Sequence, residues 1–305
     1  MKRYKITNVG CDDITEPRKT VVKPMYKAVI YHDNFQNFKR YNIPKAQLVI
    51  ADIPYNLGQN AYASNPVWYN GGDNSNGESK FAKKAFFNGD GDFKLPEYMH
   101  FCSKLVKKEP KEKNQAGAMI VFCAFEQIQM VIDLGKQYGF MNSYPLVFCK
   151  NFSAQVLKAN MKIVGATEYA VVLYRDKLPK FNNGSERDES GKTIPGSGKM
   201  IFNWFEWRRD SAKEYPKKHP TQKPVNVLKR LIEIFTDEGD VVIDPCAGSG
   251  STLVAAMELN RKAYGFEISR QFFPKAEKFI DDRFNRYGEQ ISIEEAESKL
   301  KGGAE

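Results

Sequence analysis

The chain has 305 residues, which is enough for one large α/β domain or two small ones, and its composition is that of an ordinary globular protein. Its formal net charge of +9 suits a polyanionic partner such as nucleic acid. No apolar run reaches the roughly 18 residues of a membrane span, and the amino-terminal stretch lacks the apolar core of a secretory signal, so we expect a cytoplasmic protein without a membrane partner. The five cysteines show no CxxC spacing and the three histidines are scattered, which predicts reduced thiols and no metal.

Apolar runs and amphipathic stretches alternate along the first half of the chain. Short apolar runs bounded by turn residues are typical of buried strands, and longer stretches with a period near 3.6 are typical of helices. We expect strands at 27–33, 47–52, 118–124, 144–150 and 168–176, and helices at 96–108 and 126–139.

The second half returns to the same alternation after an irregular stretch. A helix is expected at 225–236, a strand at 240–245, a turn and helix at 248–260 and a strand at 262–268, while 292–305 suggest a short frayed helix. Strands alternating with helices argue for an α/β fold with a doubly wound, mainly parallel sheet.

The apolar run at 47–52 ends in an unusual group of residues. Asp52 is followed by Ile53, Pro54 and Tyr55, and then by a loose Gly/Asn loop. Ligands of parallel sheets lie just beyond the carboxyl ends of the strands. We therefore expect Asp52 and Tyr55 at the lip of a pocket; for Asp52 the alternative is a simple strand-end cap.

A second group of residues lies at 241–259, where an apolar run ends at Asp244 and Gly248 and Gly250 flank a tight turn before a helix. Glycines allow a ligand to approach the backbone closely, and a helix amino terminus offers N–H donors. Glu267 ends the next expected strand, where a carboxylate can hold a ribose diol. The pattern favours a nucleoside-cofactor site; the alternative is an ordinary strand–turn–helix with glycines for packing.

Three motifs together resemble the amino-group DNA methyltransferases, in the β group, where the catalytic motif precedes the cofactor loop. ADIPYNLG resembles the family's D-P-P-Y motif, with Ile53 in place of the first proline. HPTQKP resembles its H-P-x-x-K-P segment, and DPCAGSGST resembles its F-x-G-x-G loop, with Cys246 in place of the phenylalanine. The resemblance covers most of residues 27–275 and implies a Rossmann-like fold with a sheet of the seven-stranded methyltransferase type.

The resemblance implies that S-adenosylmethionine is the cofactor and that the target is an exocyclic amine of a base in double-stranded DNA. Such an amine is a poor nucleophile, so acceptors must hold its hydrogens as the new bond forms. The implied catalytic residues are Asp52, Pro54 and Tyr55, with Asp52 and a backbone carbonyl near Ile53 or Pro54 as acceptors and Tyr55 stacking on a flipped base.

The resemblance also implies a set of cofactor contacts. Asp33 resembles the acid that meets the adenine edge of the cofactor, with a simple turn aspartate as the alternative. Thr221 and Lys223 are placed to meet the methionine carboxylate. The full set is Asp33, Thr221, Lys223, Asp244, Cys246, Gly248, Gly250 and Glu267.

Residues 177–218 lose periodicity and then interleave aromatic with basic residues. We interpret them as a small, irregular target-recognition insertion between a catalytic part, 1–176, and a cofactor-binding part, 219–305. Arg208 and Arg209 are candidate DNA contacts, whereas Trp204 is expected in the core. Because the insertion is short, a homodimer or a second subunit is a possible partner for gripping the duplex.

The stretch 59–92 is too long for a passive connection. It is rich in Gly, Asn and Ser but also holds aromatic residues, which disordered segments generally lack. We predict a lid that closes over the flipped nucleotide, with Lys83 and Lys84 on phosphates; the alternative is a fixed insertion on the sheet edge.

The sequence thus predicts a DNA methyltransferase of the restriction–modification kind that acts on adenine N6, because its first motif begins with an acid rather than serine. Cytosine N4 needs the same geometry and stays open. So do methylation of RNA or of a protein amide, and a catalytically silent DNA-binding subunit.

Overall fold

The protein is described here as a computed structural model, which covers residues 24–54, 93–111, 114–151, 155–158, 163–186, 188–190, 192, 194–219 and 221–286. The described helices include none long and apolar enough to cross a bilayer.

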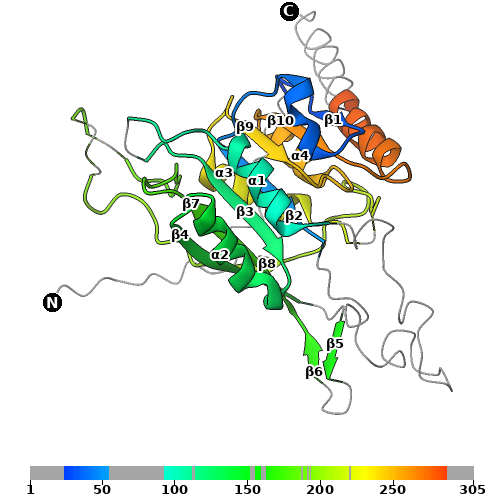
Figure 1. The fold of residues 1–305 in the computed structure, drawn as a ribbon, viewed down its shortest axis with the longest axis horizontal. Helices are drawn as coiled ribbons and strands as arrows, with labels where there is room; N and C mark the ends of the chain where they lie inside the picture. The colour runs from blue at the N-terminus through cyan, green and yellow to red at the C-terminus, as the bar shows by residue number, and fades with distance from the viewer. Residues whose placement is uncertain are drawn as a thin grey trace, which may run out of the picture.

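Eight strands form one twisted sheet in the order β1-β10-β9-β2-β3-β7-β4-β8 (Figure 1). All neighbouring pairs are parallel except those of β7, which runs antiparallel to both β3 and β4. The expected doubly wound, mainly parallel sheet is confirmed. The strands are β1 Val29–Tyr31, β2 Leu48–Asp52, β3 Ala118–Cys123, β4 Asn142–Lys150, β7 Thr167–Tyr174, β8 Trp204–Trp207, β9 Val241–Asp244 and β10 Lys262–Phe266.

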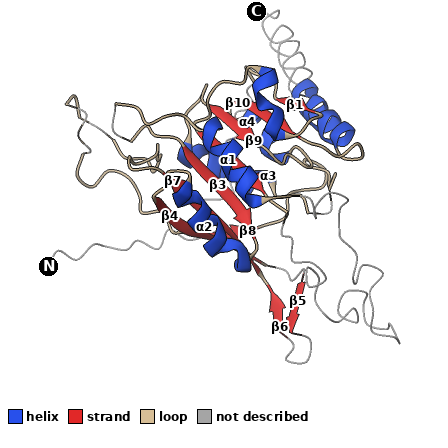
Figure 2. Ribbon diagram, viewed as in Figure 1, coloured by secondary structure: helices blue, strands red, loops and turns tan. Residues whose placement is uncertain are grey.

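Helices cover both faces of this sheet (Figure 2). One face packs on α3 (Val225–Phe235), α4 (Ser251–Glu258) and a helix over residues 273–286. The other packs on α1 (Leu95–Leu105), α2 (Ile128–Gln137) and the 3-10 helix Phe35–Tyr41. A further 3-10 turn, Phe125–Gln127, leads into α2.

The central strand β2 shows why two apolar layers are needed. Side chains of a strand alternate between the faces of its sheet. Leu48 and Ile50 therefore join the α3/α4 core, while Val49 and Ala51 join the α1/α2 core. An unbroken apolar run in the sequence is the signature of a strand buried on both faces.

The structure adds strands that the sequence pattern did not reveal. The eighth strand, β8, comes from the expected recognition insertion and extends the sheet beyond β4. A hairpin of β5 (Gln155–Lys158) and β6 (Ile163–Gly165) projects from the sheet between β4 and β7 (Figure 1). The hairpin follows β4 in the chain and so leaves the sheet at the carboxyl end of β4. Because β3 and β4 both run antiparallel to β7, this is also the edge at which β3 ends.

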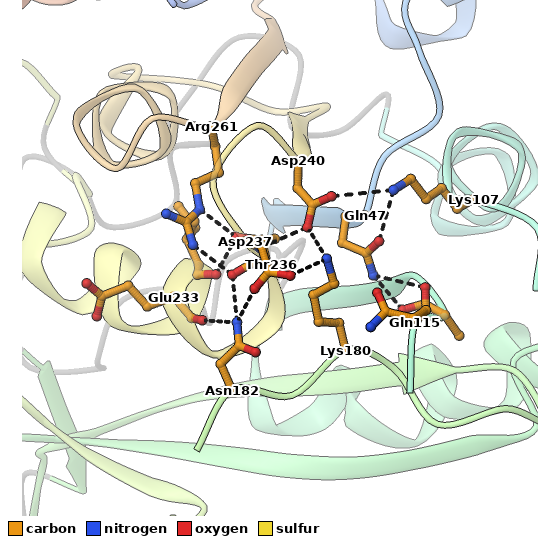
Figure 3. A network of polar contacts seen from close by, with 12 residues as sticks. Gln47, Lys107, Gln115, Lys180, Asn182, Glu233, Thr236, Asp237, Asp240 and Arg261 are labelled. Atoms are coloured by element: carbon orange, nitrogen blue, oxygen red, sulfur yellow. Dashed lines mark hydrogen bonds and ion pairs between the residues drawn. The ribbon is translucent and has the colours of Figure 1, made fainter. Parts of the chain in front are cut away.

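A polar network closes the opposite, amino-terminal edge of the sheet (Figure 3). Lys180 contacts Asp237 at 2.6 Å and Asp240 at 2.7 Å, and Asn182 donates to the carbonyl of Thr236 and the carboxylate of Asp237. Arg261 donates to the same Thr236 through two nitrogens. The start of the expected recognition insertion, which includes Lys180 and Asn182, is thereby held at the edge away from the ends of β2 and β9.

Candidate active site

Four carboxylates gather where neighbouring parallel strands end. Two of these acids are the last residues of their strands, Asp244 of β9 and Asp52 of β2. The other two follow shortly after neighbouring strands, Asp33 after β1 and Glu267 after β10. The chain continues from β9 to β10 on one side and from β2 to β3 on the other, so the boundary between β9 and β2 is a topological switch point. Ligands of open α/β sheets bind in the crevice at such a point. Asp52 and Asp244 flank it.

Asp52 is paired with a buried lysine. Lys223 Nζ lies 2.6 Å from Asp52 Oδ2 and 3.1 Å from Glu168 Oε2, and its side chain is 7% exposed. The rings of Phe122 and Trp207 lie 5.3 and 5.6 Å from the same ammonium. Burial favours the neutral amine, but Asp52 and Glu168 outweigh it and raise the pKa of Lys223. Lys223 is therefore a charged partner of Asp52.

Glu168, on β7, extends this group of charges along the same edge of the sheet toward β4. It forms ion pairs with both Lys223 and Lys150, the last residue of β4. Burial alone would raise the pKa of Glu168, but the two lysines lower it. In the order of their contacts, Lys150, Glu168, Lys223 and Asp52 alternate in sign, so the two positive charges balance the two negative charges.

The residues after Asp52 explain a departure from the family motif. The Ile53 N–H donates to the carbonyl of Phe122 at 3.2 Å, which prolongs the ladder between β2 and β3, and the Ile53 side chain is buried. Proline has no N–H and could not make this bond. The carbonyl of Pro54 accepts from Gln127 Nε2 at 3.2 Å, so a side chain at the start of α2 fixes the backbone of the motif.

Asp244 is buried at the end of β9. Its carboxylate accepts from the Cys246 N–H at 3.0 Å. Burial raises the pKa of Asp244 to about 7, and the nearby negative charges of Asp52 and Glu267 act in the same direction. A buried acid whose pKa is raised and which lies beside other acids is a candidate functional group.

The loop after Asp244 brings the backbone close to Glu267. The Gly248 N–H donates to Glu267 Oε2 at 2.8 Å, and the Ser269 N–H donates to Oε1 at 2.7 Å. Burial nevertheless raises the pKa of Glu267. Gly248 has φ +51°, and a Cβ built there meets no atom closer than 3.9 Å. Gly250 precedes α4 with φ +78°. The loop therefore needs glycine for its backbone conformation and leaves open space above Gly248.

Asp33 lies beside Glu267, because β1 pairs with β10. It accepts hydrogen bonds from the Tyr41 hydroxyl, the Asn37 amide and the Asn34 N–H. The Tyr41 hydrogen bond is the main reason that the pKa of Asp33 is lowered. Tyr41 also stacks on Tyr31 with ring centroids 4.0 Å apart.

Two further expected cofactor residues are Thr221, at the margin of the group, and Cys246, inside the loop that follows Asp244. Thr221 is exposed, and its hydroxyl shares a 3.0 Å hydrogen bond with His219 Nδ1. Burial lowers the pKa of His219 to about 4, and its ring packs on Phe272. Cys246, in place of the phenylalanine, is partly buried, and burial raises the pKa of its thiol. The described residues contain no group of three or more His, Cys, Asp or Glu that could hold a metal.

The expected DNA-binding residues are only partly described. Arg208 and Arg209 directly follow β8, and Arg208 forms a 2.8 Å ion pair with Glu206. The expectation that Trp204 is a core residue is wrong: Trp204 is 41% exposed and Trp207 is 5% exposed, because alternation on β8 turns Phe205 and Trp207 inward. Tyr55, Lys83, Lys84 and the expected lid at 59–92 lie outside the described residues, because the described range before them ends at Pro54.

Comparison with known proteins identifies the family. The family model described as DNA methylase, which covers N6 and N4 methyltransferases, matches residues 46–278. The chain belongs to this DNA methylase family. The DNA adenine methyltransferase YhdJ of Escherichia coli K12 is 24% identical over 291 residues, covering 87% of this chain and 86% of YhdJ. The type II methyltransferase M2.DpnII of Streptococcus pneumoniae is 25% identical over 266 residues, covering 86% and 93%.

Solved structures share the fold of this methylase. The M1.HpyAVI–SAM complex superposes with a TM-score of 0.56 at 23% identity, over 83% of this chain and 98% of that one. The cytosine-N4-specific PvuII DNA methyltransferase gives 0.55 at 17% identity, over 87% and 95%. At these identities the likeness establishes the Rossmann-like methyltransferase fold and nothing about the target base.

The fold brings most of the expected site residues to one edge of the sheet. Asp52, Asp244 and Glu267 face one another closely enough for their charges to interact, with the Gly248 loop beside them. Sequence reasoning missed Glu168, Lys150 and Gln127. Glu168 carried a signal, since it is an acid placed just before an apolar run, but nothing local indicated its partner.

Proposed function

We propose that this methylase transfers a methyl group from S-adenosylmethionine to the N6 amine of adenine in duplex DNA. The observation that carries the proposal is the position of Asp52, a carboxylate at the switch point of the sheet, beside a glycine loop and the Glu267 carboxylate. A base-modifying site and a nucleoside site are thus adjacent, as a transfer between them demands.

The residues at the ends of β1, β9 and β10 suit S-adenosylmethionine. Glu267 can accept from the two ribose hydroxyls, and the open space over Gly248 allows a ligand to approach the backbone. Asp244, whose pKa is raised to about 7 by burial, gains from a nearby cationic ligand. Asp33, Thr221, Cys246 and Gly250 complete the proposed contacts. The cofactor supplies the electrophilic methyl group.

The chain's own residues prepare the amine. The Asp52 carboxylate accepts one amino hydrogen and the Pro54 carbonyl, fixed by Gln127, accepts the other. These acceptors orient the nitrogen lone pair toward the methyl donor, so the rate gain comes from positioning and preorganised charge. Tyr55 is proposed to stack on the flipped base.

Adenine is favoured over cytosine by the relatives. YhdJ is named as an adenine methyltransferase, and the motif of this chain begins with Asp52 rather than serine. The fold itself does not choose, because the PvuII enzyme with the same fold is cytosine-N4-specific.

DNA binding is proposed at the rim beyond β8. Arg208 and Arg209 would contact phosphates or guanine edges, and Lys83 and Lys84 would contact phosphates from the proposed lid at 59–92. We retain residues 177–218 as the proposed recognition insertion between 1–176 and 219–305, with a homodimer or second subunit as an additional grip. Because the proposed substrate is DNA, we propose the cytoplasm of a bacterial or phage-infected cell as the location.

The test is methylation of unmodified genomic DNA by purified protein with labelled S-adenosylmethionine, followed by nucleoside analysis and mapping of modified positions. The proposal predicts N6-methyladenine at one recurring sequence. N4-methylcytosine would reassign the base. Cofactor binding without any transfer to DNA would overturn the proposal in favour of a silent subunit or a different acceptor.

A further inference from the structure

The ammonium of Lys223 occupies a closed position. Carboxylates of Asp52 and Glu168 lie at 2.6 and 3.1 Å, and the rings of Phe122 and Trp207 lie on other sides. The motif that contains Lys223 suggested a contact with the methionine carboxylate of the cofactor. The two carboxylates, however, already take two of the three N–H donors of the ammonium, and the side chain is only 7% exposed, so a ligand has little access to it.

From this geometry we infer that Lys223 and Glu168 are positioning residues for Asp52, and that Lys150 supports them through Glu168. The inference rests on the proposed function, because it concerns the acceptor that holds the target amine. Lys223 contacts the Asp52 carboxylate directly and Glu168 contacts Lys223, so both act through Asp52.

The role of Glu168 follows from the charges. Lys223 divides its hydrogen bonds between two carboxylates, so Asp52 keeps the capacity to accept a hydrogen bond from an amine. Without the Glu168 charge, the whole ammonium would be drawn to Asp52 and would compete with the amine for it. Lys150, at the end of β4, balances Glu168 in turn and keeps it aimed at Lys223.

The arrangement also connects distant parts of the fold. Asp52 ends β2, Glu168 lies on β7, Lys150 ends β4, and Lys223 precedes α3. The antiparallel insertion of β7 next to β3 is what brings Glu168 to the catalytic edge. A shift of β7 or β4 would be transmitted to the Asp52 carboxylate.

The test compares full-length Glu168→Gln, Lys150→Met and the double variant with wild type. We expect Glu168→Gln to slow single-turnover methyl transfer to a duplex substrate by roughly 10- to 100-fold. Dissociation constants for S-adenosylmethionine and for the duplex should stay within about twofold. Lys150→Met should slow transfer less, and the double variant should be no slower than Glu168→Gln alone, because both act through one carboxylate.

Glu258→Gln is the matched control. The Glu258 side chain, which is 1% exposed, likewise lies between two cations, Lys229 at 2.6 Å and Arg283 at 2.5 Å, but it belongs to the last residue of α4 and not to a strand end at the site. This variant should lower the melting temperature and leave the transfer rate of the folded protein unchanged. Glu168→Asp, which keeps the charge, should recover part of the lost rate.

Three results would overturn the inference: wild-type transfer in Glu168→Gln, additive losses in the double variant, or weaker cofactor binding as the main defect. Lys223→Met separates the two roles of the lysine, since a slow but cofactor-saturable enzyme supports positioning and a lost cofactor affinity contradicts it. Absence of transfer in the wild type would instead refute the proposed function.

Discussion

The amino-terminal and carboxyl-terminal edges of the sheet carry the same types of charged and polar residues, but the residues have different roles at the two edges. At the amino-terminal edge, Lys180 contacts two carboxylates, and Asn182 and Arg261 bond to backbone carbonyls of neighbouring loops (Figure 3). At the carboxyl-terminal edge, Asp52, Asp244 and Glu267 lie near one another, and their like charges contribute to the raised pKa of Asp244.

The difference lies in how the charges are compensated. Burial lowers the stability of charged groups at both edges, but at the amino-terminal edge opposite charges and carbonyls offset that cost within the protein. At the other edge, within the part of the chain that the structure describes, Asp52 is paired with the buried cation Lys223, whereas Asp244 and Glu267 accept hydrogen bonds from backbone N–H groups. The contacts at the amino-terminal edge stabilise the fold, and we propose that the acids at the carboxyl-terminal edge serve ligand binding.

The strongest test of this contrast removes the acid at the switch point. Asp52→Ala should reduce methyl transfer by roughly 100- to 10,000-fold while S-adenosylmethionine binding stays within about twofold, because the carboxylate serves the base and not the cofactor. Asp240→Asn, an acid paired with Lys180 at the opposite edge, should keep the transfer rate. Normal transfer by a saturated Asp52→Ala enzyme would refute the assigned role.

The raised pKa of Asp244 should be visible in the pH dependence of stability. A pKa of about 7 in place of 3.8 means that the native state holds a proton that the unfolded state has lost between about pH 4 and 7. The free energy of unfolding then falls as pH rises through this window, by on the order of 4 kcal/mol in total.

Asp244→Asn should remove this decline and be more stable than wild type at pH 8, yet bind the cofactor less well. Urea denaturation at pH 5, 6, 7 and 8 measures the difference between the two proteins. Parallel pH profiles would show that Asp244 titrates normally.

Glu267 should matter for the cofactor alone. Glu267→Gln is expected to weaken S-adenosylmethionine binding by about 1–3 kcal/mol, the cost of losing a charged hydrogen-bond acceptor. Isothermal titration calorimetry gives the dissociation constant, and Glu277→Gln, an exposed acid on the helix at 273–286, is the control. An unchanged dissociation constant would remove Glu267 from the proposed ribose site.

The smallest effect is expected at the amino-terminal edge. Asn182→Ala removes amide contacts to the carbonyls of Glu233 and Thr236 and to the Asp237 carboxylate. It should lower the free energy of unfolding by about 1–2 kcal/mol in urea titrations, with methyl transfer unaffected. A slowed transfer rate in the folded variant would mean that this edge is coupled to the site.

Local pattern was sufficient for most strands and helices of the sheet and for the acids at the strand ends, but not for β5, β6 and β8. Apolar runs ending at Asp52, Asp244 and Glu267 were recognisable because a strand buried on both faces must be apolar throughout, so a carboxylate can appear only where the strand leaves the core. The same reasoning located α3 and α4, whose amphipathic or apolar stretches pack on the sheet.

Only the tertiary structure decided which of these residues meet. Lys223 and Asp52 are 171 residues apart in the chain, and their pairing depends on the order of the strands. Periodicity reports neighbours on one strand or one turn of helix, whereas contacts between strands arise from the packing of the whole domain. The sequence by itself therefore determined the family, the strand ends and their acids; the antiparallel β7, and with it the Glu168–Lys223–Asp52 arrangement, was decided by the fold.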